Sequence, residues 1–140
     1  MRHILTSVFL IVLLLPALAL GETVKFEDLV KREGLYYKKS NDIPFTGKTT
    51  GQIQGSFKDG KEDGPWVKYH DNGGIEEKGT YKDGKEDGPW VYYWNNGQLS
   101  SKGTYKDGKS DGPWVWYYDK GQLSNNGTYK DDKRHGPWVR

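Results

Sequence analysis

The 140-residue chain has 21 Lys and Arg residues against 19 Asp and Glu residues, which gives a formal net charge of +2. It contains no cysteine, which excludes disulfide bonds, zinc held by thiolates and the lipid-bearing cysteine of a bacterial lipoprotein. A charge so close to balance gives no electrostatic footprint for nucleic acid, so we expect no nucleic-acid partner.

The first residues carry the pattern of a signal peptide. Arg2 supplies a positive start, an apolar stretch covers residues 4–15, and a small-x-small cleavage motif ends at Ala19. Cleavage after Gly21 would satisfy the same rule nearly as well. The apolar stretch is shorter than the roughly 20 residues of a membrane span. The sequence therefore predicts export to the periplasm or the medium, with residues 1–19 removed and no transmembrane span in the mature chain.

The segment 20–54 lies between the predicted signal peptide and the repeats, and we expect it to cap them. Within it, the apolar residues between Glu22 and Glu33 fit either a single helical turn or a short strand. A repeat array needs a cap at its end, because an uncovered terminal unit exposes its apolar face.

A unit of 24 residues repeats along the rest of the chain. The unit 79–102 aligns without gaps to 103–126 with 17 identical positions, and to 55–78 with 15 identical positions. A partial unit covers 127–140. Self-similarity at a fixed period indicates an architecture in which successive units stack on one another.

Each unit contains two short strands and several turn signals. In the unit that starts at Gly79, residues 90–94 are aromatic or β-branched, and residues 98–105 alternate as in a half-buried strand. These patterns predict an all-β fold of tandem antiparallel β-hairpins. The turn signals are Asp83-Gly84, Asp87-Gly88-Pro89 and Asn95-Asn96-Gly97, the last predicted to be an Asn-Gly hairpin turn with positive φ at both central residues.

Comparison of the units separates fixed from varying positions. Fixed positions are expected to provide the packing that every unit reproduces, and a fixed glycine within a strand often marks the close approach of another group, here a Trp or Tyr ring. The fixed positions are Gly79, Pro89, Trp90, Val91, Tyr93, Gly103, Pro113, Trp114, Val115 and Tyr117. Varying positions are free to serve recognition, and these interaction candidates are Lys68, His70, Tyr92, Trp94, Trp116 and Tyr118.

The unit G-T-Y-K-D-G-K-x-D-G-P-W-V-x-Y-Y-x-N-G-Q-L, found at 79–99, resembles the MORN repeat variant family of bacteria. The resemblance covers 55–140 and extends more weakly to 34–39 and 44–48, which look like a degenerate first repeat. It implies hairpins stacked into an elongated, twisted, single-layer sheet, with a role in protein or membrane attachment. Members of the family are often labelled antitoxin components of toxin–antitoxin systems. The predicted export of this chain departs from a simple antitoxin, which must meet its toxin where the toxin acts.

The chain offers little for catalysis, cofactors or metals. Outside the predicted signal it has two histidines, His70 and His135, which stand at different places in their units. The repeating aspartates resemble the start of a calcium-binding loop, but Lys61 and His70 stand where ligand oxygens are needed. The glycine-rich turns fit no phosphate-binding pattern. The sequence therefore predicts a protein that is not an enzyme and uses no cofactor or metal.

Two classes of function remain open. The first is an exported, non-catalytic scaffold that binds a protein partner or associates with itself. The second is a module that binds a cell-wall glycan or a membrane surface. In the second class, Tyr92 and Trp94 would align with Trp116 and Tyr118 as an aromatic stripe, because strands two apart in a sheet lie roughly 10 Å from one another.

Overall fold

The computed structural model describes residues 21–140, which fold almost entirely into β-strands. The predicted signal peptide, residues 1–19, lies outside the described residues. The elements, in chain order, are β1 (Glu22–Lys25), the 3₁₀ turn η1 (Phe26–Asp28), β2 (Leu29–Arg32), β3 (Leu35–Lys38), β4 (Gly47–Thr50), β5 (Ile53–Lys58), β6 (Lys61–Tyr69), β7 (Ile75–Lys82), β8 (Lys85–Glu86), β9 (Gly88–Tyr93), β10 (Leu99–Lys106), β11 (Lys109–Tyr117), β12 (Leu123–Lys130) and β13 (Lys133–Val139).

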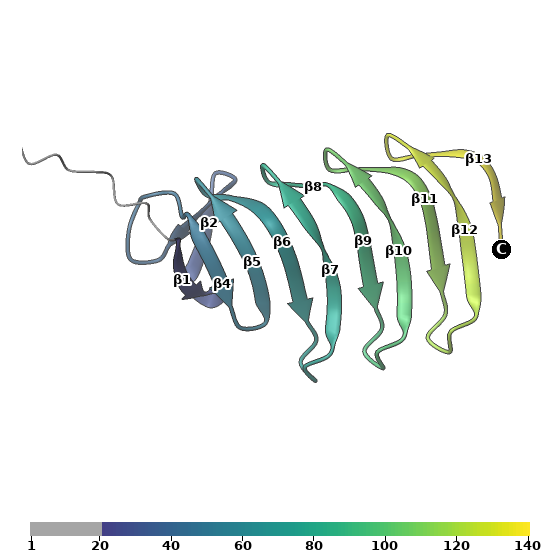
Figure 1. The fold of residues 1–140 in the computed structure, drawn as a ribbon, viewed down its shortest axis with the longest axis horizontal. Helices are drawn as coiled ribbons and strands as arrows, with labels where there is room; N and C mark the ends of the chain where they lie inside the picture. The colour runs from purple at the N-terminus through teal and green to yellow at the C-terminus, as the bar shows by residue number, and fades with distance from the viewer. Residues whose placement is uncertain (1–20) are drawn as a thin grey trace, which may run out of the picture.

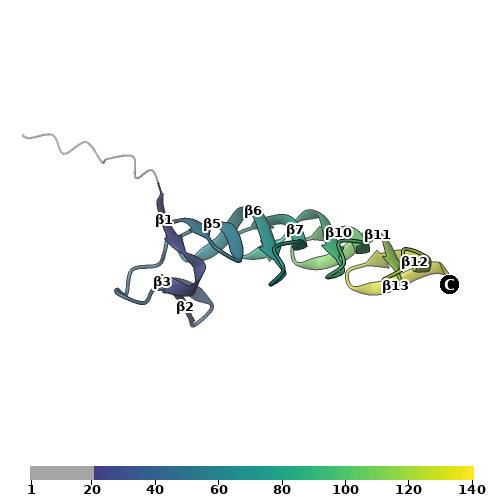
Figure 2. The same ribbon diagram turned by 90° about the horizontal axis from the view of Figure 1, so that it is seen from below.

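One long sheet holds most of these strands, in the order β1-β4-β5-β6-β7-β9-β10-β11-β12-β13, with β8 paired to β7. From β4 onward every pairing in it is antiparallel, and successive hairpins follow one another along the long axis of the molecule (Figure 1). Seen at right angles, the sheet is a narrow body without a second layer over the repeats (Figure 2). The predicted fold class, an all-β single sheet of tandem antiparallel hairpins, is confirmed.

The N-terminal segment is built differently from the repeats. Both alternatives for Glu22–Glu33 occur, since strands β1 and β2 flank the single turn η1. Strand β1 pairs in parallel with β4, whereas β2 and β3 form a separate two-stranded sheet that stands to one side of the long one (Figure 2). The hydrophobic cluster beneath this segment contains Leu29, Phe45 and Phe57, with Phe26 and Tyr36 packed against it.

One end of each hairpin closes with a two-residue turn, which we call the aspartate turn. At Asp83-Gly84 the backbone φ angles are 52° and 79°, and Lys82 pairs directly with Lys85. Two consecutive positive φ angles define a type I′ turn, whose twist matches that of the flanking strands. The same turn recurs at Asp59-Gly60, Asp107-Gly108 and Asp131-Asp132.

The opposite end of each hairpin corrects the prediction of an Asn-Gly turn with two positive φ angles. Gly97 has a φ of 83°, but Asn96 is not among the residues with positive φ. The Gly97 N–H donates to the Trp94 carbonyl at 2.8 Å, and the Trp94 N–H donates to the Gln98 carbonyl at 2.8 Å. This is a three-residue loop that ends in a left-handed glycine. We call it the three-residue turn.

The predicted turn at Asp87-Gly88-Pro89 is also wrong, because this segment leads into and begins strand β9 rather than reversing the chain. In the next unit, the equivalent residues 111–113 lie inside β11. The pairing of Gly103 with Trp114 and of Tyr105 with Ser110 leaves extra residues on β11, which is a β-bulge. A bulge tolerates proline and bends the strand. The Asp-Gly-Pro segments, which have the composition of turns, therefore curve the sheet instead of reversing the chain.

Each unit places a tryptophan ring over the glycine of the neighbouring strand. A Cβ atom added to Gly103 would overlap the ring carbons of Trp114, and the same holds for Gly79 beneath Trp90. Trp90 is only 1% exposed although no second layer covers it. The predicted contact between the fixed glycines and an aromatic ring is therefore confirmed, and it supplies the burial that a second layer would otherwise give.

We expect Gly103→Ala to lower the free energy of unfolding by about 1–3 kcal/mol, the range for overpacking a core. Gly103 does not have a positive φ, so the effect would come from the clash with Trp114. The matched control is Gly74→Ala, directly after a three-residue turn, where the added Cβ would meet only the Asn72 amide oxygen, at 3.2 Å. That change should stay below about 0.5 kcal/mol. Urea unfolding followed by tryptophan fluorescence measures both, and equal losses would contradict the account.

Candidate functional site

Stacked rings run along one face of the sheet and form what we call the aromatic column. It consists of Trp90, Tyr92, Trp114, Trp116 and Trp138. Consecutive ring centroids lie 6.1, 6.3, 5.7 and 5.5 Å apart, with interplanar angles between 21° and 28°. Two interaction candidates, Tyr92 and Trp116, thus lie half-buried between the fixed tryptophans of successive units. Each links one unit to the next, since stacked aromatic pairs contribute about 0.5–1.5 kcal/mol beyond the area that they bury.

A row of tyrosines packs edge-on against the aromatic column. The Tyr105 ring lies 5.1 Å from the Trp114 ring at 85°, and the Tyr105 hydroxyl lies 3.3 Å from the Tyr92 hydroxyl. Burial, followed by this hydrogen bond, raises the pKa of Tyr92 above its ordinary value of 10.0. Burial and the nearby Glu86 carboxylate raise the pKa of Tyr81 in the same way. These hydroxyls therefore stay protonated at neutral pH and belong to the packed aromatic face.

A second pair of interaction candidates bonds to the following unit near the three-residue turns. The His70 ring nitrogen Nε2 lies 3.0 Å from the Tyr93 carbonyl oxygen, and Trp94 Nε1 donates to the Tyr117 carbonyl at 3.1 Å. Trp94 nevertheless keeps 40% of its surface exposed, and Tyr118, in the corresponding position of the next unit, keeps 57%. Both rings are therefore available to a ligand.

Lys68, the remaining candidate, forms an ion pair on its own hairpin. Its Nζ lies 2.7 Å from Glu76 Oε1. The hydrogen bond to Glu76 raises the pKa of Lys68, partly offset by burial. All six candidates lie near the three-residue turns, at or just beyond the ends of β6, β9 and β11. Only the rings of Tyr92 and Trp116 stack within the column. Their role in recognition stays a prediction.

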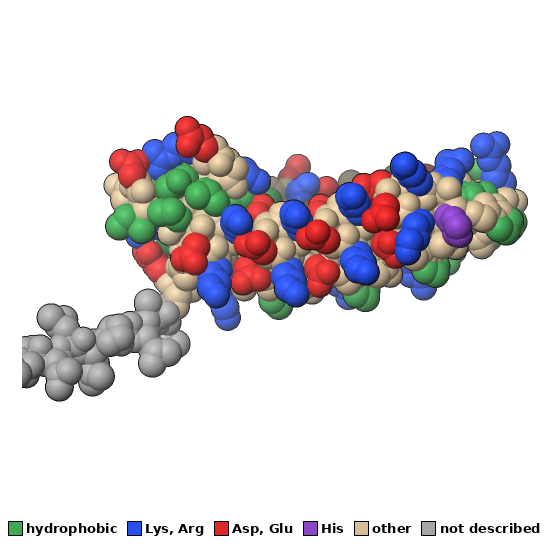
Figure 3. Space-filling model, turned by 90° about the horizontal axis from the view of Figure 1, so that it is seen from above, with side chains coloured by type: hydrophobic (Ala, Val, Ile, Leu, Met, Phe, Trp, Pro, Cys, Tyr) green, Lys and Arg blue, Asp and Glu red, His purple; other side chains and the backbone are tan. Residues whose placement is uncertain are grey.

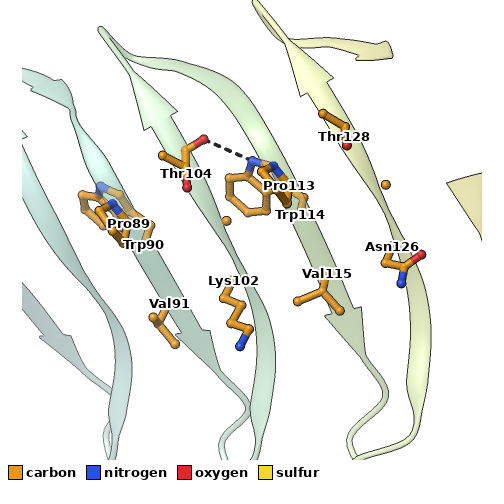
Figure 4. A pocket seen from close by; sticks show the side chains of 12 residues that line it. Pro89, Trp90, Val91, Lys102, Thr104, Pro113, Trp114, Val115, Asn126 and Thr128 are labelled. Atoms are coloured by element: carbon orange, nitrogen blue, oxygen red, sulfur yellow. Dashed lines mark hydrogen bonds between the residues drawn. The ribbon is translucent and has the colours of Figure 1, made fainter. Parts of the chain in front are cut away.

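The other face of the sheet carries a shallow groove of about 560 Å³, shown in Figure 4. Fixed prolines and valines line it, together with residues of the intervening strands. One row across the strands alternates proline with threonine, and the next alternates valine with lysine or asparagine. The groove side chains are Pro89, Val91, Lys102, Thr104, Pro113, Val115, Asn126 and Thr128.

Comparison of the repeat units did not predict this groove, because it assigned the residues that are fixed between units to packing alone. Val91 and Val115 are fixed between units, yet they are half-buried on a face that no other layer covers. The signal that points to them is strand alternation: Val91 lies between Trp90 and Tyr92, so it must face away from the aromatic column. A valine or proline repeated on the open face of a one-layer sheet is a surface residue.

The aspartate turns form a row of alternating charges. Lys61 Nζ lies 3.2 Å from Asp83 of the next unit, and Lys85 Nζ lies 3.2 Å from Asp107. Figure 3 shows basic and acidic side chains alternating along this edge. Exposed pairs of this kind contribute about 0–1 kcal/mol each, and together they leave no large surface of one sign.

The described residues offer neither a metal cluster nor a membrane-spanning helix. Between residues 21 and 140 no three His, Cys, Asp or Glu side chains come together in an arrangement that could hold a metal ion. Within the same range, no helix has the length and apolar character needed to cross a membrane.

Three consecutive segments match the family model described as MORN repeat variant, at residues 62–83, 86–107 and 110–131. The matches begin 24 residues apart, and each covers one hairpin of the long sheet. The chain thus contains three tandem segments that are similar to the MORN repeat variant. MORN repeats are non-catalytic modules for binding. A comparison with curated proteins found no match, and the antitoxin role implied by the resemblance stays a prediction.

We expect the repeats to lose stability above pH 10, in part through Tyr92. Because burial raises the folded pKa of Tyr92 above 10.0, the unfolded chain loses this proton at a lower pH than the folded chain. The stabilising contribution is complete below pH 10 and declines as the pH rises through the folded pKa. Urea midpoints at pH 8 and pH 11 should show a smaller drop for Tyr92→Phe than for the unsubstituted protein. An equal drop would contradict the burial of this hydroxyl.

Proposed function

We propose that the chain is an exported, non-catalytic scaffold that binds an extended, acidic segment of a protein partner along the proline–valine groove. The observation that carries the proposal is that the prolines and valines of this groove recur every 24 residues on an uncovered face of the described sheet. Contiguous apolar surface rimmed by polar side chains is typical of protein interaction sites.

The charges in the groove define the chemistry of the partner. Lys102 lines the groove and pairs across the strands with Val91 and Val115. Lys78 lies on the same face beside the groove, where it pairs with Val67 and Val91. Among residues 21–140, no carboxylate lies within 4.0 Å of the ammonium group of either lysine. These two lysines therefore favour a partner that carries carboxylates.

The spacing of the lysines sets a period for the partner segment. Lys78 and Lys102 are two strands apart, which is roughly 10 Å in a sheet. An extended chain advances about 3.3 Å per residue, so a segment that crosses the strands would meet a lysine at roughly every third residue. We expect carboxylates at that spacing with apolar residues between them, each of which would lie against a valine or a proline.

The other interpretations are less well supported. A membrane surface is attracted by clusters of basic residues, whereas the aspartate turns present both signs in alternation (Figure 3). The antitoxin role is the special case in which the protein partner is a toxin. Export rests on the signal peptide pattern of residues 1–19.

Site-specific photo-crosslinking tests the groove. A photo-reactive residue at Val91 should capture a discrete protein in the cell envelope, whereas the same residue at Lys120, in an exposed three-residue turn, should not. Lys102→Glu should abolish the product by placing a negative charge in the groove. The matched control Lys106→Glu, on the same strand but outside the groove, should preserve it. Capture that survives Lys102→Glu would contradict the proposal.

Mass spectrometry of the chain recovered from a bacterial envelope tests export. We expect a mature protein that begins at Leu20, or at Glu22 if cleavage follows Gly21. Replacing Leu13 and Leu14 with Arg interrupts the apolar stretch and should leave the full-length chain in the cytoplasm. Recovery of the unsubstituted chain at full length from the cytoplasm would count against export.

A further inference from the structure

One row of directly paired residues crosses the uncovered face of the sheet from β5 to β13, and we call it the valine row. Residues that pair directly across antiparallel strands point to the same face, so the row keeps its face from strand to strand. Valines occupy every second position, from Val67 to Val139. Figure 4 shows the part of the row that lies in the proline–valine groove. The polar residues that alternate with the valines are Gln54, Lys78, Lys102 and Asn126.

The spacing of the polar residues in the valine row sets the repeat of any peptide that follows it. Lys78 and Lys102 both pair with Val91, so one strand separates them. Neighbouring strands lie about 4.7–4.9 Å apart, which places successive polar residues roughly 9.4–9.8 Å apart. A peptide that lies along the row therefore needs side chains on one side of its backbone at that interval.

A polyproline II segment has this repeat, whereas a β-strand does not. Polyproline II has three residues per turn and rises about 3.1 Å per residue, so every third side chain points the same way at about 9.3 Å. Alternate side chains of a β-strand point the same way at about 6.6 Å, and neither one nor two such steps meets the next lysine. Polyproline II also leaves its carbonyls free of internal hydrogen bonds. The hydroxyls of Thr104 and Thr128, beside the valine row, can donate to them.

An α-helix is a poorer fit to the shape of the groove. Residues seven apart in a helix lie about 10.5 Å apart on nearly the same side, which is close to the interval of the lysines. A helix with its side chains is about 10–12 Å wide, however. The two rows of the groove, which contain Pro89 and Val91, are two residues apart along a strand, or roughly 7 Å. A helix would extend beyond both rows of this shallow groove, whereas a narrower extended chain would not.

The two ends of the valine row limit where the partner carries charge. Gln54 and Asn126 are amides, which donate and accept hydrogen bonds but offer a carboxylate no ion pair. Resting on the proposed function, we infer that the groove binds a polyproline II segment of the partner with two acidic residues, at i and i+3. These face Lys78 and Lys102. Uncharged polar residues at i−3 and i+6 face the two amides.

Fluorescence anisotropy with the chain from residue 20 onward tests the conformation of the bound segment. The probes are three labelled peptides with two glutamates each: a proline-rich peptide with the glutamates at i and i+3, a proline-rich peptide with them at i and i+2, and an alanine-rich helical peptide with them at i and i+7. We expect the i, i+3 peptide to bind at least tenfold more tightly than either of the others. Equal or tighter binding of the i, i+2 peptide or of the helical peptide would overturn the inference.

Extension of the lysine series tests the register. Asn126→Lys places a third ammonium group at the same interval and should strengthen binding of a peptide with glutamates at i, i+3 and i+6 by up to about fivefold, the gain from one exposed ion pair. The matched control Gln122→Lys adds the same charge in the exposed turn before β12 and should leave that affinity unchanged. Equal gains from the two variants would contradict the register.

Failure of this inference is distinguishable from failure of the proposed function. Absence of binding by all three peptides at millimolar concentration would overturn the inference. If a photo-reactive residue at Val91 still captured a protein, and Lys102→Glu abolished that capture, the protein-binding groove would stand with a partner of another conformation. Loss of both peptide binding and capture would contradict the two proposals together.

Discussion

The contact of a tryptophan ring with the bare backbone of a glycine on the neighbouring strand governs this structure. A one-layer sheet has no opposing layer to exclude water, so each unit must bury its apolar surface on its own strands. The ring of Trp114 lies over Gly103 where no side chain intervenes, and Trp116 and Tyr92 stack on its two sides. Aromatic side chains bury about 150–250 Å² each, which makes a continuous column of them an effective core.

This arrangement divides the sheet into two faces with different duties. On one face, the rings of the aromatic column pack successive units against one another. The β-bulge at each Asp-Gly-Pro segment bends the strand that contains it. The other face repeats its prolines and valines without covering them, so that identical units present an identical surface at a regular interval. The exposed rings of Trp94 and Tyr118 directly follow β9 and β11, outside the aromatic column. A single 24-residue unit thus supplies both the core and the surfaces that can bind.

The fold could be predicted because the same strand pattern recurs in each unit of the sequence. The glycine–aromatic contact could be predicted because a glycine is fixed within a strand. The turns at Asn96-Gly97 and Asp87-Gly88-Pro89 were wrong because the same residue types serve several backbone shapes. Hydrogen bonding across the hairpin determines the three-residue turn at Asn96-Gly97, and pairing with β7 determines the bulge at Asp87-Gly88-Pro89. The pairing of β1 with β4 depends on contacts distant in the chain. Val91 is fixed but faces away from the aromatic column, whereas the varying Tyr92 stacks within it, because neighbouring residues of a strand face opposite sides of the sheet.

Removal of one whole unit tests the central claim most directly. Deletion of 79–102 joins Lys78 to Gly103 and restores every tryptophan–glycine contact, whereas deletion of 79–101 shifts the strands by one residue and turns the rings to the wrong face. Urea unfolding by near-ultraviolet circular dichroism should show a cooperative transition for the 24-residue deletion, with a smaller denaturant slope that reflects the smaller buried surface. The 23-residue deletion should show no cooperative transition. Equal behaviour of the two deletions would contradict the account.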